Sequence, residues 1–270
     1  MNLSTTAGIC SAFPATDKER LMVGKLLVRG MLAGIAAGLL TFSFAKIAGE
    51  PQVDQAISFE QKADEAKGEA PEPELVSRHT QAGIGLLTGV LAYGAAIGGL
   101  FALSFAAMIG RVGKLGAKPL SALIALGGFV VLVVVPGIKY PANPPSVGDP
   151  ETIGFRTGLY FLMIAISLAA MVFSLGVRRA ALSRLGAGNA SIIGGALFVV
   201  VIAAVQIAMP AINEVPSAFP AVLLWKFRLA AFGMQVIMWT ALGLLFGALA
   251  ERSLYSVSSR QAMPRAYSNG

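Results

Sequence analysis

Charged side chains are scarce in this 270-residue sequence: they make up 13% of it, against about 25% in soluble domains. The single cysteine, Cys10, cannot form a disulfide within the chain, and the single histidine, His79, cannot join a second histidine at a metal site. Nucleotide-binding, HExxH and CxxC motifs are missing as well. The composition therefore excludes a disordered chain, a disulfide scaffold and an ordinary cytosolic enzyme.

Apolar residues are abundant instead. Hydrophobic side chains make up 56% of the sequence, and the mean hydropathy is +0.72. A bilayer core about 30 Å thick needs roughly 20 residues of apolar helix. We therefore predict an all-α fold, a polytopic transmembrane helical bundle. Six windows are long enough to span: Gly24–Ala48, Gln81–Gly110, Leu120–Ile138, Gly154–Val177, Asn189–Met209 and Phe227–Ala250.

The basic residues predict the orientation of these spans. Two short turns, 111–119 and 178–188, each carry three basic residues and no acid, which is typical of cytoplasmic loops. With both termini on the cytoplasmic side, thirteen of the 21 basic residues lie inside and eleven of the 14 acids lie outside. The net charge of +7 is then a consequence of topology, so it needs no nucleic-acid partner.

The six predicted spans divide the chain into three parts. Residues 1–20 are expected to form a flexible cytoplasmic leader, residues 21–252 the membrane domain and residues 253–270 a cytoplasmic tail. Three outer loops connect the spans: an acidic loop at 49–80, a proline-rich loop at 139–153 and a loop at 210–226. The run at 60–74 reads as a solvated linker, and a short interfacial helix is expected just before it.

The three helix pairs follow a shared plan. Each has an outgoing span, an outer loop with proline and acid, and a basic residue at the start of the return span. This pattern suggests three parallel hairpin repeats. The alternative is convergent interface chemistry, because proline ends helices and basic residues suit the headgroup region.

Glycines recur every four residues in the first two spans, as in Gly30, Gly34 and Gly38 and again in Gly85 and Gly89. Such spacing puts them on one helix face, where backbones can approach closely. We expect this face to serve packing within the chain, and the other reading is a contact that builds a homo- or hetero-oligomer.

Ionisable side chains lie only near the ends of the spans or in loops, which argues against an intramembrane enzyme or a proton relay. We therefore predict no enzymatic activity and no bound cofactor. The outer loops do supply oxygen and imidazole ligands for a divalent transition metal. The candidate residues for a metal entry site are His79, Glu50, Asn143, Glu214, Asp149 and Glu151.

If the hairpins surround an axis, Glu50, Asn143 and Glu214 are expected to converge at its outer mouth. The basic residues that begin the return spans would then pair with them; these are Arg78, Arg156 and Arg228. For each carboxylate taken singly, the competing interpretation is a solvated loop charge or an ion-pair partner.

Several segments resemble the predicted cobalt transporter family of the CbtA type. The most specific is the sixteen-residue loop Lys139–Gly154. The others are Leu27–Gly34, Gly49–Pro51, Asn213–Pro216, Leu223–Leu229 and Gly243–Arg252. The resemblance implies an inner-membrane component of cobalt(II) uptake for cobalamin synthesis in bacteria. It also implies a small single-span partner with a histidine-rich end, in addition to contact with membrane lipid.

Two functions from different classes remain open at this point. The first is uptake of a divalent metal, cobalt, through the outer-face oxygens and His79. The second is a membrane scaffold or accessory subunit that holds a larger complex together and moves no solute. The absence of an ATP-binding motif leaves the energy source of transport undefined.

Overall fold

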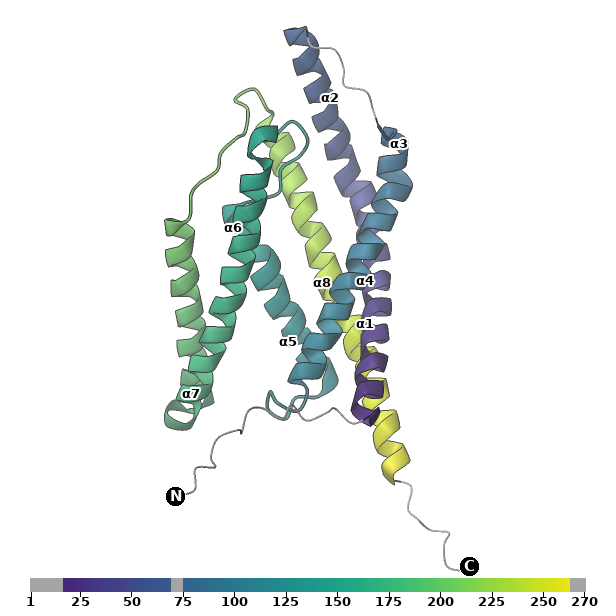
Figure 1. The fold of residues 1–270 in the computed structure, drawn as a ribbon, viewed down its shortest axis with the longest axis vertical. Coiled ribbons are helices and arrows are strands. Elements are labelled where there is room, and N and C mark those ends of the chain that lie inside the picture. The colour runs from purple at the N-terminus through teal and green to yellow at the C-terminus, as the bar shows by residue number, and fades with distance from the viewer. Residues whose placement is uncertain (1–16, 69–74, 263–270) are drawn as a thin grey trace, which may run out of the picture.

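The computed structural model describes residues 17–68 and 75–262, and within these ranges the chain is helical with no strand (Figure 1). The all-α prediction is confirmed. Five helices are long and apolar enough to cross a membrane: Met22–Lys67, Arg78–Met108, Ala117–Lys139, Pro150–Ala208 and Ala221–Arg252. They form an open bundle of long rods, and the loops predicted to be outer lie at one end of it.

The first rod contains α1 (Asp17–Phe44), the π-helix η1 (Ala45–Gly49) and α2 (Glu50–Lys67) without a break. Pro51 lies in the first turn of α2, where its missing N–H costs little. The acidic loop predicted at 49–80 is therefore helical as far as Lys67. Helix α1 begins within the leader predicted at 1–20, of which residues 1–16 lie outside the described part of the chain.

The chain returns through α3 (Arg78–Thr80), the π-helix η2 (Gln81–Gly85) and α4 (Leu86–Met108). Helices α1 and α4 pack through glycine against glycine. A Cβ at Gly34 would overlap the Gly94 carbonyl oxygen, and one at Gly30 would overlap that of Gly98. These four glycines are therefore covered within the chain, as packing of small residues between membrane helices requires.

The third rod joins α5 (Ala117–Phe129), the π-helix η3 (Val130–Val134) and α6 (Val135–Lys139). It packs along α8 (Ala221–Ala262), where the buried Ser121 hydroxyl donates to the Gly243 carbonyl at 2.6 Å. Phe105 and Phe246 meet edge to face in the same core, with ring centroids 5.0 Å apart. The main core thus lies between α1, α4, α5 and α8.

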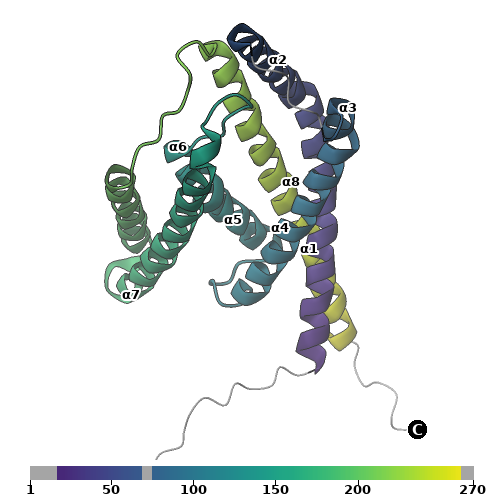
Figure 2. The same ribbon diagram turned by 45° about the horizontal axis from the view of Figure 1, so that its top comes forward.

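After the short 3-10 turn η4 (Pro150–Thr152), α7 (Ile153–Ala208) is a hairpin of two arms. Its backbone leaves the helical conformation at Gly186, whose φ of 73° favours glycine. Figure 2 shows the two arms standing apart from the α1–α4–α8 group. A small core of Val135, Met163 and Ile202 joins the arms to the third rod.

The predicted fourth and fifth windows are thus the two arms of α7. The turn between α4 and α5 and the bend at Gly186 lie at the same end as the start of α1 and the end of α8 (Figure 1). The three hairpins are packed unequally, because α1 and α4 share a long interface whereas the second arm of α7 stands apart from α8.

Candidate functional site

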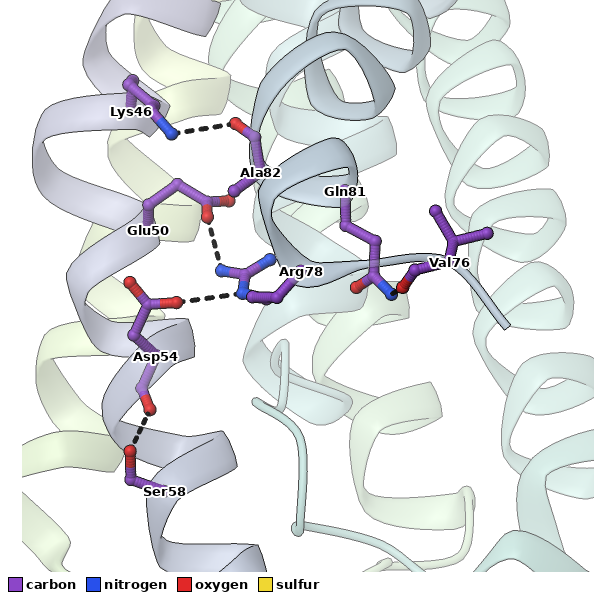
Figure 3. Close-up of polar contacts among 8 residues, drawn as sticks. All are labelled: Lys46, Glu50, Asp54, Ser58, Val76, Arg78, Gln81 and Ala82. Carbon is purple, nitrogen blue, oxygen red and sulfur yellow. Dashed lines mark hydrogen bonds and ion pairs between the residues drawn. The ribbon is translucent and has the colours of Figure 1, made fainter. Parts of the chain in front are cut away.

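Two polar clusters occupy the end of the bundle that holds the loops predicted to be outer. The first joins the start of α2 to α3 (Figure 3). The Arg78 guanidinium forms an ion pair with Glu50 and donates to the Asp54 carboxylate at 2.9 Å. The Lys46 ammonium donates to the Ala82 carbonyl oxygen at 3.1 Å. Two cations and two carboxylates therefore tie the outer ends of the first hairpin together.

His79 follows Arg78 on α3, and its side chain is exposed. The Ser77 hydroxyl caps this short helix by accepting from the Thr80 amide at 3.4 Å. Arg78 is bonded to α2, whereas the side chain of His79 is exposed. The imidazole of His79 is therefore not part of the ion-pair cluster around Arg78.

The second cluster surrounds a cavity of about 420 Å³ beside the proline-rich loop. Four segments contribute to it: the loop after α6, the start of α7, the loop before α8 and the start of α8. Its polar lining residues are Tyr140, Asn143, Arg156, Thr157, Tyr160, Asn213, Glu214 and Arg228.

Glu214 is the best-anchored carboxylate of this cavity. It accepts the Asp149 amide at 2.8 Å and the Thr152 hydroxyl at 2.7 Å, and the Arg156 Nε lies 3.3 Å away. The Asp149 amide, followed by the Thr152 hydroxyl, holds the pKa of Glu214 below its ordinary value. Desolvation opposes this effect, and the charge of Arg156 makes the smallest contribution to lowering the pKa. Glu214 is therefore a carboxylate at neutral pH.

Arg156 is fitted closely to the proline-rich loop. Its guanidinium donates to the Asp149 carbonyl at 3.0 Å and lies against the backbone of Gly148. A Cβ at residue 148 would overlap the guanidinium, and the φ of 120° is also unfavourable for any other residue. The loop therefore needs glycine at this position to accept the arginine.

Arg228 holds the other side of the cavity. It donates to the Asn143 side-chain oxygen at 2.9 Å and to the Ala142 carbonyl oxygen at 3.3 Å. Asp149 caps the turn before α7 by accepting the Glu151 amide at 2.9 Å, and the Glu151 side chain is exposed. Asp149 and Glu151 thus lie beside the cavity but are not part of its lining.

The structure brings together two of the three residues expected to converge. Asn143 and Glu214 share the cavity with Arg156 and Arg228, whereas Glu50 lies in the first cluster. The pairing is reciprocal between the second and third hairpins: Arg156 meets Glu214, and Arg228 meets Asn143. Within the described ranges no three side chains of His, Cys, Asp or Glu are grouped closely enough to hold a metal ion.

Some polar residues of these clusters did not enter the predicted set. Asp54 stands one helical turn after Glu50, so the i, i+4 spacing carried a signal for it. Thr152 donates a hydrogen bond to Glu214, and Tyr160 lines the cavity. Both positions depend on the fold of the loop, and no spacing in the sequence indicates them.

The low pKa of Glu214 predicts how the outer loops respond to acid. A carboxyl group with a lowered pKa stabilises the folded state at neutral pH, and that contribution is lost as the pH falls through the folded-state pKa. We expect the melting temperature in detergent to fall as the pH drops below 4.5, the ordinary pKa of a glutamate, and to fall by less in Glu214→Gln than in the wild type. The exposed Glu151→Gln variant is the control, and an equal acid response in Glu214→Gln and the wild type would contradict this role.

Long apolar helices with a polar cavity at one end define a multi-pass membrane protein. The family described as Probable cobalt transporter subunit (CbtA) has a model that matches residues 23–251, and the chain belongs to this family. The comparisons with curated proteins and with solved structures gave no match. The resemblance found in the sequence is thus confirmed, and cobalt transport across a membrane is the activity that the family indicates.

Proposed function

We propose that this chain is the membrane-spanning subunit for cobalt(II) uptake in a bacterial inner membrane, and that cobalt(II) enters through the outer cavity. The observation that carries the proposal is the cavity beside Glu214 in a chain of this family. Its carboxylate is ionised at neutral pH, and Asn143 and Asn213 add amide oxygens. Such oxygens are ligands for hard and borderline divalent cations.

The proposal includes six spans, with the two arms of α7 crossing separately and both termini in the cytoplasm. It is supported by the Gly186 bend, which lies at the same end as the basic turn between α4 and α5 (Figure 1). The positive-inside rule favours this end as the cytoplasmic one. The three parallel hairpin repeats stay a prediction. The arginine at the start of each return helix favours them, whereas the unequal packing of the three hairpins argues against them.

Within the same proposal, a small single-span partner with histidines delivers the metal to the outer face. His79, exposed on α3, supplies the imidazole ligand on this chain, and Glu50, Asp149 and Glu151 add negative charge around the mouth. The argument for a partner is that His79 is the only histidine of the chain and borderline divalent metals favour imidazole.

The test is cobalt accumulation in cells that lack the chain and carry it back on a plasmid. We expect the wild type to restore uptake and each of Glu214→Ala, Asn143→Ala, Glu50→Ala and His79→Ala to lower it. Asp64→Ala on α2, which removes a carboxylate that pairs with Lys67 within its own helix, is the matched control. Unchanged uptake in all four variants at equal membrane levels would overturn the entry site.

The second candidate is a scaffold subunit that transports nothing itself. The absence of a metal-ligand group among the described residues favours it. In liposomes such a chain would pass no cobalt, with or without its small partner, and in mild detergent it would purify in fixed proportion with a larger complex. Cobalt flux through the reconstituted chain and partner would exclude this candidate.

A further inference from the structure

The lining of the outer cavity is rich in hydrogen-bond donors and in positive charge. Of the described residues that line it, Glu214 is the only acid, whereas Arg156 and Arg228 are both cations. The lining therefore carries a net positive charge. The first turn of α7 also borders the cavity, and the positive end of a helix dipole favours an anion over a cation.

The one carboxylate of this lining is already engaged by protein donors. The Asp149 amide and the Thr152 hydroxyl donate to its two oxygens at 2.8 and 2.7 Å, and the Arg156 Nε lies 3.3 Å from one of them. A carboxylate has about four positions that can accept a donor. A metal ion that reached Glu214 would therefore compete with protein donors for a carboxylate whose charge Arg156 already balances.

The two arginines, in contrast, keep donors in reserve. A guanidinium offers N–H donors on each of its nitrogen atoms. In the part of the chain that the structure describes, Arg156 donates to the Asp149 carbonyl at 3.0 Å, and Arg228 donates to the Ala142 carbonyl at 3.3 Å and to the Asn143 side-chain oxygen at 2.9 Å. The Nη1 atom of neither arginine makes a hydrogen bond with a described residue.

Neutral donors stand beside these arginines. Thr157 and Tyr160 line the cavity, and their hydroxyls make no hydrogen bond with any residue that the structure describes. The cavity volume of about 420 Å³ lies within the range of about 300–1,000 Å³ that is usual for small-molecule pockets. The cavity thus combines free donors, net positive charge and room for an organic anion.

The first polar cluster does not share these properties. Arg78 directs its Nε to Asp54 and a second nitrogen to Glu50, so its charge is balanced by two carboxylates. The unbalanced positive charge therefore belongs to the cavity and is not a general feature of the outer end.

We propose that the outer cavity receives cobalt(II) as an anionic chelate with a small polycarboxylate, whose outward-facing carboxylate oxygens bind Arg228 and Arg156. This inference rests on the proposed function and names the form in which the metal arrives. Planar guanidinium groups bind carboxylates through paired hydrogen bonds. The chelator supplies the oxygen ligands of cobalt(II), and the negative charge of the complex suits a positive lining that repels the hydrated ion.

The test is a calorimetric titration of the purified full chain in nanodiscs of phosphatidylcholine. The probes are citrate, cobalt(II) citrate, which keeps a net negative charge, and cobalt(II) chloride. We expect both citrate probes to bind, and Arg228→Gln to weaken their binding about tenfold through the loss of a charge-assisted hydrogen bond. Thr157→Val keeps the side-chain shape and removes one hydroxyl, so it should weaken their binding about threefold.

Lys226→Gln is the matched control, because it removes a positive charge of the same helix that does not line the cavity. It should leave the binding of both citrate probes unchanged. Any binding of cobalt(II) chloride should be equal or stronger in Arg228→Gln, because removing a positive charge favours a cation.

Citrate probes that fail to bind, or that bind equally to the wild type, Arg228→Gln and Thr157→Val, would contradict the inference. Loss of citrate binding when phosphatidylglycerol replaces part of the phosphatidylcholine would also contradict it, because the arginines then hold a lipid phosphate. Cobalt uptake in cells tests the proposed function separately. A chain that restores uptake but binds no citrate refutes the inference alone, whereas a chain that binds citrate but restores no uptake refutes the proposed function and cobalt as the cargo of the cavity.

Discussion

The Gly34→Ala variant is expected to melt at a clearly lower temperature than the wild-type protein in the same detergent. The new methyl group would overlap the backbone carbonyl of Gly94, so no side chain can move aside and α1 must shift away from α4. Overpacking a well-packed core costs about 1–3 kcal/mol. We expect the upper part of this range or more, because the same shift also separates Gly30 from Gly98.

Gly89→Ala is the matched control for this experiment. It changes the same residue type in α4, but a Cβ at Gly89 has no atom within 4 Å. Alanine is the better helix former by about 1 kcal/mol, so this variant should melt at or slightly above the wild-type temperature. The measurement is a thermal melt followed by size-exclusion chromatography, and equal melting of the two variants would contradict the glycine contact.

Helix positions could be predicted closely because bilayer thickness sets the length of an apolar run. The window Gln81–Gly110 corresponds to a helical stretch that the structure gives as Arg78–Met108. Helix α2 was harder to foresee, because its second half is charged and carries no hydropathy signal. Its Glu, Ala, Lys and Gln residues are good helix formers, and Asp64 pairs with Lys67 along its surface at 3.7 Å.

The polar contacts of the outer end were partly accessible from the sequence as well. Arginine at the start of each return helix, opposite a loop with an acid or an amide, indicated the partners of Arg78, Arg156 and Arg228. The loop with which each arginine pairs depends on how the hairpins pack. The predicted arrangement of three hairpins around an axis treats the three hairpins as equivalent, so it does not distinguish between their loops. The observed exchange joins only the second and third hairpins, because Arg78 is satisfied within the first.

The cavity could not be predicted for a related reason. Its polar lining residues come from two loops and from helices α7 and α8, which are far apart in the sequence. Only the folded arrangement of these segments brings them together.

Replacing Arg78 by alanine is expected to destabilise the outer end of the first hairpin strongly. The Glu50 side chain is 12% exposed, so the substitution leaves a mostly enclosed carboxylate without its cation. Removing one partner of a buried ion pair costs about 3–5 kcal/mol. The loss here should be about half of that, because the guanidinium is 26% exposed and water can reach the site.

The double variant Arg78→Ala with Glu50→Gln separates the ion pair from simple loss of packing. Glutamine has no charge to leave uncompensated, so the double variant should melt at a higher temperature than Arg78→Ala alone. Asp54 is 60% exposed, and its replacement by asparagine should change little in either background. If Arg78→Ala and the double variant melt together, the arginine stabilises this end through its aliphatic stem, and the ion pair with Glu50 contributes nothing measurable.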